Sequence, residues 1–339
     1  MELGFLSCRG LSPQKLKLHC KLVEDSGGYS ICFDEDYLCE DTFSRAGFAA
    51  SITSRVLLNV MPNCYTRHPA LTAMSAVTLD RMSGGRMRLL LNRSVGPWME
   101  GLLGYDYRSP AKAMENYLHV LEKLIADEEV NFASKQFTLR NARLNMAPIR
   151  SHIPVLIGAM GPRTLEWATK EADGVVLNIY TSSTYAKWAT QLIREKSSST
   201  PFEIGCQIRI SITDDAGAKI RSLKPEIAFL LSLPNFGELF LEKSGFETTI
   251  LDPIREALKM PELLARNRDP AEAFEVGNVP KAISYLPDEV VEVFAAVGSV
   301  GKCRERLGEY SKAGVTFGSL FVDENEFEKV ATHLHELFP

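Results

Sequence analysis

Short hydrophobic runs alternate along this chain with longer segments in which hydrophobic residues recur every three or four positions. The switch between a period of two and a period of 3.6, with turn residues between, predicts alternating strands and helices. The predicted strands cover 3–8, 29–34, 55–61, 86–91, 153–159, 174–178, 204–212 and 317–322. The predicted helices cover 13–25, 42–51, 69–81, 117–126, 163–171, 185–196, 300–313 and 324–337.

Eight strands separated by helices favour one closed parallel sheet. Such strands are joined by right-handed crossovers, and eight of them form an α/β fold of the (β/α)8 TIM-barrel type. The alternative is an open, doubly wound sheet, which would favour a Gly-x-Gly-x-x-Gly turn after the first strand. No such turn follows residues 3–8. The sequence therefore predicts a TIM barrel with its chemistry at the carboxyl ends of the strands.

Two segments interrupt the alternation. Residues 130–146 alternate like a hairpin across Ser134-Lys135, and residues 214–290 are mostly helical in pattern but contain seven prolines. We interpret them as a hairpin insertion and as a helical insertion before the last strand–helix unit. Because neither an internal repeat nor a flexible linker is present, residues 1–339 are predicted to form one elaborated domain.

Composition narrows the class of protein. With 45% hydrophobic and 24% charged residues, the 339-residue chain is typical of a globular protein. A net charge of −5 without a long basic stretch argues against nucleic acid, and no apolar run is long enough to span a membrane. The seven cysteines form no Cys-x-x-Cys pair, which favours free thiols over a metal site. We expect a cytoplasmic protein that acts on a small molecule.

Acidic and polar residues follow the second and third predicted strands. Asp34, Glu35 and Asp36 come directly after the second strand, where three carboxylates repel one another unless they are solvated. Asp34 and Glu35 emerge first, so we expect both to lie in the cavity and to do general acid/base work. After the third strand, Asn63 and Tyr65 offer hydrogen bonds to a ring cofactor.

A cation and an aromatic ring follow the fourth predicted strand. Arg93 fits an anionic group, although a surface salt bridge accounts for it equally well, and Trp98 follows in the same polar turn. Both residues are therefore candidates for binding the substrate at the mouth of the barrel.

Small residues and hydroxyl groups follow the fifth and sixth predicted strands. Gly158, Ala159 and Gly161 stand before a helix. There, backbone N–H groups and the helix N-terminus favour an anion such as phosphate. Asn178 and Thr181 add donors on the same rim. Because glycine at turns is often structural, this motif predicts a phosphate site only in combination with its neighbours.

Three blocks of sequence resemble a known family. They are residues 67–73 with 78–86, residues 153–162 with 171–174, and residues 297–299 with 313–316. Together they are similar to the bacterial-luciferase-like flavin-dependent oxidoreductases. Within that superfamily the blocks most resemble the methylenetetrahydromethanopterin reductases, which use the deazaflavin coenzyme F420. The resemblance spans most of the chain and is poorest over 215–285.

The resemblance implies a barrel whose mouth holds the cofactor ring. In the family, the ring lies against a backbone bulge after the third strand, which corresponds to Val60-Met61 here. Contacts with the ring carry over to Asp34, Asn63 and Tyr65. The phosphate-bearing tail carries over to the residues named above after the fifth and sixth strands. Family members usually form homodimers, so a homodimer is expected.

Two positions depart from the family pattern. Where the family commonly has Asp-His after the second strand, this chain has Asp34-Glu35. The deazaflavin-dependent members carry a glycine-rich turn after the fourth strand, and this chain has Asn92-Arg93-Ser94-Val95. Three explanations stay open at this point: a different substrate, a differently bound cofactor, or loss of cofactor binding.

The leading hypothesis is hydride transfer between coenzyme F420 and an electron-poor C=C or C=N bond. Glu35 is the candidate acid, a role that requires burial to raise its pKa, and Asp34 would orient the ring or the substrate. The alternatives are a monooxygenase that uses flavin mononucleotide (FMN) and a non-catalytic family member that has lost its cofactor. The identity of the substrate is not predicted.

Overall fold

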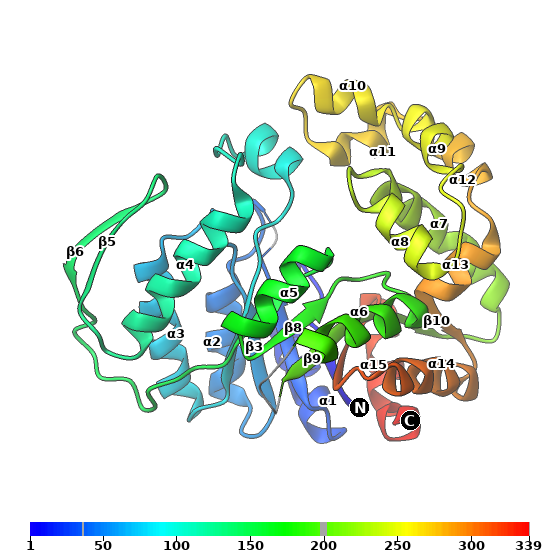
Figure 1. Ribbon diagram of the computed structural model, residues 1–339. Coiled ribbons are helices and arrows are strands. Elements are labelled where there is room, and N and C mark those ends of the chain that lie inside the picture. The colour runs from blue at the N-terminus through cyan, green and yellow to red at the C-terminus, as the bar shows by residue number, and fades with distance from the viewer. Residues whose placement is uncertain (36, 197–201, 339) are drawn as a thin grey trace.

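Eight parallel strands close into a barrel in the computed structural model, which describes residues 1–35, 37–196 and 202–338 (Figure 1). Neighbouring strands pair in the order β11-β1-β2-β3-β4-β7-β8-β9, and β9 pairs back with β11. The strands are β1 (Glu2–Leu6), β2 (Ser30–Asp34), β3 (Leu57–Met61), β4 (Met87–Leu91), β7 (Val155–Gly158), β8 (Gly174–Leu177), β9 (Glu203–Ile212) and β11 (Phe317–Phe321). The predicted TIM barrel is confirmed.

Helices cover the outside of the barrel. They are α1 (Pro13–Asp25), α2 (Thr42–Ile52), α3 (Pro69–Ser83), α4 (Pro110–Ile125), α5 (Pro162–Glu171), α6 (Ser183–Lys196) and α14 (Val300–Ala313). Proline stands at the start of four of them, where its missing N–H costs nothing. The single helix predicted over 324–337 is wrong. That segment is a 3-10 turn, η3 (Glu324–Glu326), and two short helices, α15 (Phe327–Thr332) and α16 (Leu334–Leu337), each burying its own apolar residues.

Both predicted insertions are present. Strands β5 (Val130–Ala133) and β6 (Thr138–Ala142) form an antiparallel hairpin. Residues 216–294, called the helical insertion below, form a group of helices beside the barrel (Figure 1). These are α7 (Ala216–Ser232), α8 (Gly237–Ser244), α9 (Leu251–Ala257), α10 (Met260–Ala265), η2 (Pro270–Glu272), α11 (Ala273–Val276), α12 (Val279–Ser284) and α13 (Asp288–Phe294). The organisation as one domain stays a prediction.

A short strand that the sequence analysis missed follows the helical insertion. Strand β10 (Ala295–Gly298) pairs in parallel with residues 209–212, at the far end of the ten-residue strand β9. Its four residues, Ala-Ala-Val-Gly, are too few to show a period of two.

A polar network fills the end of the barrel interior where the strands begin. The Arg88 guanidinium forms an ion pair with Glu203 and donates from Nε to Asn59 Oδ1 at 2.8 Å. It also lies 4.7 Å from the centroid of the Phe317 ring. Beside this network an apolar cluster lines the interior, formed by Leu6, Cys32, Leu90, Leu156, Val176 and Phe317. The packed interior leaves only the carboxyl ends of the strands for a site.

Three further observations concern the described part of the chain. Among the described residues, no helix combines the length and the hydrophobicity that crossing a bilayer requires. In the same part of the chain, no group of three or more His, Cys, Asp or Glu side chains is arranged to hold a metal ion. All seven cysteines are free thiols, and each is buried except Cys39.

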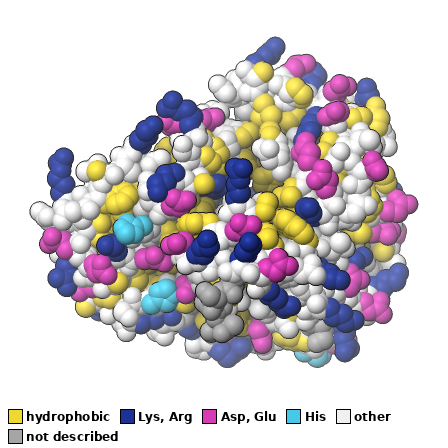
Figure 2. Space-filling view, viewed as in Figure 1, with side chains coloured by type: hydrophobic (Ala, Val, Ile, Leu, Met, Phe, Trp, Pro, Cys, Tyr) yellow, Lys and Arg dark blue, Asp and Glu magenta, His cyan; other side chains and the backbone are white. Residues whose placement is uncertain are grey.

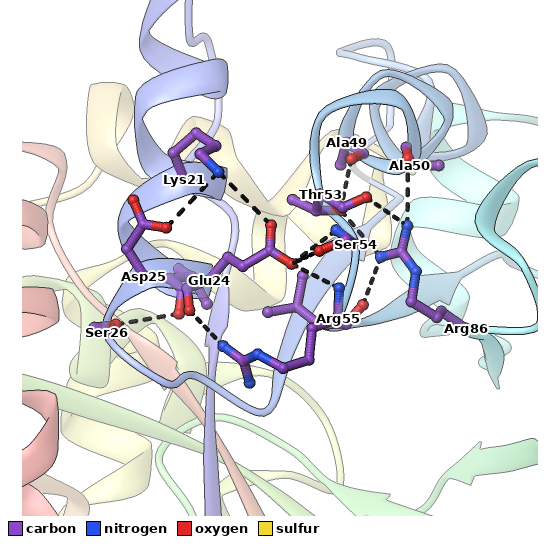
Figure 3. A network of polar contacts seen from close by, with 12 residues as sticks. Lys21, Glu24, Asp25, Ser26, Ala49, Ala50, Thr53, Ser54, Arg55 and Arg86 are labelled. Carbon is purple, nitrogen blue, oxygen red and sulfur yellow. Dashed lines mark hydrogen bonds and ion pairs between the residues drawn. The ribbon is translucent and has the colours of Figure 1, made fainter.

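A second polar network ties helices together at the beginning of the strands (Figure 3). Glu24, near the end of α1, accepts hydrogen bonds from the backbone N–H groups of Ser54 (2.7 Å) and Arg55 (2.6 Å) and from the Ser54 hydroxyl. Burial alone would raise the pKa of Glu24, but these hydrogen bonds outweigh it and lower the pKa. The carboxylate therefore joins α1 to the segment that leads into β3.

We expect Glu24→Gln to lower the free energy of unfolding at pH 7 by about 1.5–3 kcal/mol, because hydrogen bonds to a charged acceptor are lost. The native pKa lies below the unfolded value of about 4.5. The difference in the free energy of unfolding between wild type and variant should therefore be largest above pH 4.5. It should shrink as the pH falls through the native pKa of Glu24. Urea unfolding at several pH values measures it. As a control, Asp25→Asn, which alters an exposed carboxylate 3.7 Å from Lys21, should change the midpoint little.

Candidate active site

Asp34 stands at the carboxyl end of β2, opposite Met61 of β3 in the strand register. Because side chains alternate along a strand and Cys32 lines the interior, Asp34 also points inward. Its Oδ2 accepts a hydrogen bond from Arg9 Nη2 at 2.7 Å. The side chain is largely buried, and its Oδ1 has no hydrogen-bond partner among the described residues. This oxygen can accept a hydrogen bond from a bound molecule. Asp36 lies outside the described residues.

Glu35 connects the ends of β2 and β3. Its Oε2 accepts from the Asn63 backbone N–H at 2.9 Å, and its Oε1 accepts from the Thr66 hydroxyl. Burial raises the pKa of Glu35, and these two hydrogen bonds oppose that shift. The raised pKa matches what an acid needs, but both carboxylate oxygens already have donors. These hydrogen bonds hold the loop after β3 in place. The raised pKa also allows Glu35 to donate a proton.

A buried asparagine in the loop after β3 connects the loops after β2 and β4. Asn63 Nδ2 donates to the Tyr37 hydroxyl at 2.8 Å and to Asn92 Oδ1 at 3.1 Å. Neither Tyr37 nor Asn92 is among the predicted site residues. Asn92 directly follows a predicted strand, so the criterion that selected Asp34 would have found it. Tyr37 lies in a loop, and nothing in its sequence context points to Asn63.

The predicted ring contacts after β3 divide between the interior and the outer core. Met61 packs on the interior, whereas Val60 is fully buried on the other face of the sheet. Val60 can therefore offer only its backbone to a ligand. Tyr65 packs against Tyr107, with ring centroids 5.1 Å apart, and burial raises its pKa. The side chain of Tyr65 is part of the loop packing and does not join Asp34.

Arg93 lies beside the N-terminus of helix α5. Its Nη2 donates to Thr164 Oγ1 at 3.3 Å, and among the described residues no carboxylate lies within 4 Å of it. Gly161 occupies the N-cap of α5 and provides no side-chain hydrogen bond to the first turn. A Cβ on Gly158 would lie 3.4 Å from Asn92 Cβ, so the ends of β7 and β4 approach closely there. An unpaired cation and an uncapped helix N-terminus together suit an anion.

Most of the other residues predicted to bind the phosphate-bearing tail are buried and already form hydrogen bonds within the protein. Ala159 is buried, and its N–H donates to Val176. Thr181 is buried as well, and its hydroxyl donates to the backbone oxygen of Asn178. Asn178 is only partly buried, and its backbone N–H donates to Met160 Sδ at 3.2 Å. Of these predicted residues, only Asn178 keeps a side chain that a ligand could reach.

Trp98 joins the barrel to the helical insertion. It lies in a π-helical turn, η1 (Pro97–Leu102), and its Nε1 donates to Asp269 Oδ1 at 3.1 Å. Its ring centroid lies 6.4 Å from that of Tyr37 and 6.4 Å from that of Phe229 on α7. On the face drawn in Figure 2, hydrophobic side chains gather in the hollow between the barrel and the insertion. Asp269 is 171 positions from Trp98, and the sequence carries no sign of this contact.

Known proteins share this architecture over nearly the whole chain. A 5,10-methylenetetrahydromethanopterin reductase from Archaeoglobus fulgidus is 26% identical over 321 residues, covering 93% of this chain and 92% of that protein. The coenzyme F420-dependent tetrahydromethanopterin reductase of Methanopyrus kandleri has a solved structure with a TM-score of 0.82 and 24% identity, covering 100% of this chain and 99% of that one. A monooxygenase from Streptomyces bottropensis superposes with a TM-score of 0.69 at 16% identity, covering 99% of each chain.

Residues 9–316 match the family described as luciferase-like monooxygenase. That range contains the polar contacts of Asp34, Glu35 and Asn63, the contact of Arg93 with the first turn of α5, and the whole helical insertion. The family resemblance of the three sequence blocks is thus confirmed over most of the chain. With its eight-stranded barrel and its inserted hairpin and helices, this chain belongs to the luciferase-like monooxygenase family.

Proposed function

We propose that this protein is an oxidoreductase that binds coenzyme F420 and transfers a hydride between the deazaflavin ring and an electron-poor C=C or C=N bond. The observation that carries the proposal is the presence of two complementary features at one end of the barrel. Asp34 offers a free carboxylate oxygen to a bound molecule, and Arg93 with the α5 N-terminus offers a place for an anion. The reductases similar to this chain are supporting evidence.

The residues at the mouth fit a cofactor with a planar ring and a phosphate-bearing tail. When bound, such a deazaflavin supplies the hydride. Arg93 and the first turn of α5 would hold the phosphate, and Met61 and Asp34 would face the ring. Asn92, which stands where deazaflavin-dependent relatives have a glycine-rich turn, directs its side chain to Asn63 and the backbone of Met61. Because the Asn92 side chain forms hydrogen bonds within the protein, we infer that the cofactor is bound differently and that the site has not been lost.

FMN is the alternative cofactor, because it also joins a flat ring to a phosphate and because monooxygenases share the fold. The test is quenching of tryptophan fluorescence during titration with each cofactor. We expect micromolar binding of coenzyme F420 and much weaker binding of FMN. Binding of FMN alone would favour the monooxygenase, and binding of neither would favour the non-catalytic alternative.

Arg93→Gln tests the anion site without measuring activity. Loss of one charge-assisted contact, worth about 1.5–3 kcal/mol, should weaken coenzyme F420 at least tenfold. Binding of the same deazaflavin without its phosphate-bearing tail should stay unchanged. Arg304→Gln, which alters an exposed arginine on the outer helix α14, serves as the matched control. Equal weakening of both deazaflavins would contradict a phosphate contact.

We propose different roles for the two predicted catalytic carboxylates. The free oxygen of Asp34 would contact the ring or the substrate, whereas Glu35 would hold Asn63 and Thr66 in place. The competing assignment, expected from the sequence, makes Glu35 the acid. It stays a prediction, and the burial and raised pKa of Glu35 support it.

Replacing each carboxylate by its amide separates these roles. Asp34→Asn should lower turnover by roughly 10- to 100-fold, because it removes the charge from a hydrogen-bond acceptor whose contact is worth about 1.5–3 kcal/mol, with a smaller effect on coenzyme binding. Glu35→Gln puts an amide group where Glu35 accepts two hydrogen bonds, so it should mainly lower the melting temperature. Steady-state kinetics, coenzyme titration and thermal unfolding measure these effects. If Glu35→Gln abolishes turnover at unchanged stability, Glu35 is the acid and our division of roles is wrong.

We further propose that the protein is cytoplasmic, because its cysteines are free thiols.

We also infer that two copies of the chain associate through helix α3. On α3, Ala73 and Val77 are buried against the barrel, as expected for packing. Leu71, Met74 and Met82 form an exposed stripe, each more than half exposed. Thr78 lies in this stripe, and its hydroxyl donates to the backbone of Met74 at 2.7 Å. The stripe therefore offers an apolar surface to a second copy.

Met74→Glu should convert a dimer into a monomer, because a carboxylate would be buried without a partner. Size-exclusion chromatography with light scattering measures the mass. Leu18→Glu on α1, where a similarly exposed leucine lies outside the stripe, should leave the dimer intact. A monomeric wild type at micromolar concentration, or a dimer that survives Met74→Glu, would rule out this interface.

A further inference from the structure

Four aromatic side chains form a row from the polar mouth of the barrel to the surface of the helical insertion. Successive ring centroids are 6.4 Å apart from Tyr37 to Trp98, 6.4 Å from Trp98 to Phe229, and 5.0 Å from Phe229 to Phe274. The four rings come from the loop after β2, from η1, from α7 and from α11. We call this set the aromatic row. Two loops at the mouth of the barrel and two helices of the helical insertion therefore meet to build it.

The aromatic row is less buried than the aromatic side chains of the hydrophobic core. Ten of these, among them Tyr117, Tyr185, Phe240 and Phe294, are almost completely buried. In contrast, Tyr37, Trp98 and Phe229 are only partly buried, and Phe274 is 45% exposed. Leaving contiguous rings in water forgoes hydrophobic free energy, and such surfaces commonly bind a ligand.

One end of the row is joined to the proposed reaction site. The Tyr37 hydroxyl accepts a hydrogen bond from Asn63, which also contacts Glu35 through its backbone. A molecule that reaches Asp34 with a polar group can therefore extend along the aromatic row with the rest of its length. The outer end carries the Arg268–Glu272 ion pair, so the apolar surface has a polar rim.

Trp98, the second ring of the row, is held in a fixed orientation. Asp269 Oδ1 accepts from Trp98 Nε1 at 3.1 Å and from the backbone N–H of Ala271 at 2.9 Å. The first contact fixes the indole, and the second fixes the carboxylate at the N-cap of η2. A ring fixed in this way presents a flat surface at a low entropic cost of binding.

We propose that Trp98 and Phe229 determine specificity by binding a flat, apolar part of the substrate, and that Asp269 positions Trp98 for this contact. The proposal rests on the proposed function and adds the substrate class. The substrate is an electron-poor unsaturated compound whose polar end lies near Asp34. Its conjugated or aromatic remainder lies along the aromatic row.

The experiment compares two ketones that differ only in the group on the conjugated bond. These are 4-phenylbut-3-en-2-one, which carries a phenyl ring, and pent-3-en-2-one, which carries a methyl group. Isothermal titration calorimetry in the presence of oxidised coenzyme F420 gives both dissociation constants without hydride transfer. Burial of the phenyl ring should make the first ketone bind at least about tenfold more tightly, because tenfold corresponds to 1.4 kcal/mol.

Substitutions test whether the ratio of the two dissociation constants depends on the aromatic row. Trp98→Ala and Phe229→Ala should each reduce the ratio to about threefold or less. Phe229→Ala alters a partly exposed ring outside the barrel, so it tests the proposal even if Trp98→Ala does not fold. Asp269→Ala should also reduce the ratio, and Asp269→Asn, which keeps an acceptor oxygen, should restore it. Trp188→Phe on α6 is the matched control and should not change the ratio.

Equal affinity for the two ketones, failure of the phenyl ketone to bind, or a ratio that survives both ring variants would overturn the proposal. A structural role of Trp98 predicts the last of these results, with a lower melting temperature as the only effect. Failure of the proposed function is seen separately, as failure of coenzyme F420 to bind. In that case the same titrations of the free protein still decide whether the aromatic row binds a flat apolar group.

Discussion

The pairing of β9 with β8 on one side and with β11 on the other closes the sheet, and the rest of the molecule depends on this closure. In a closed parallel sheet, all carboxyl ends meet at one rim. Asp34, Asn63 and Arg93 come from segments up to 59 positions apart and are brought to that rim because each follows a strand of the barrel. The polar Arg88 network fills the opposite end of the interior and leaves the rim as the place for chemistry.

The two departures from the family pattern have a common structural explanation. Glu35 and Asn92, which replace the expected histidine and glycine-rich turn, both form hydrogen bonds with Asn63. Together they build a polar row across the ends of β2, β3 and β4. The substitutions therefore support each other, because a buried polar group needs partners. This observation favours a site that has been rebuilt over a site that has been lost.

The helical insertion completes the mouth of the barrel. The hydrogen bond between Trp98 and Asp269 and the ring contact between Trp98 and Phe229 connect the loop after β4 to the insertion. The resemblance to the family is poorest over 215–285, within this insertion. The part of the chain that departs most from the family pattern thus lies beside the mouth of the barrel, which is a suitable place for substrate specificity.

The sequence by itself determined the number and order of the barrel strands, the hairpin, the helical insertion and the candidates at the ends of strands. Periodicity and turn residues are local properties, so they can be read along the chain. Only the tertiary structure decided what each candidate contacts. It buried the Val60 side chain in the outer core, paired the Thr181 hydroxyl with the backbone of Asn178, left one oxygen of Asp34 without a partner among the described residues, and brought Asp269 to Trp98. These contacts join residues distant in sequence, and a hydrogen-bond partner 171 positions away leaves no periodic or compositional trace.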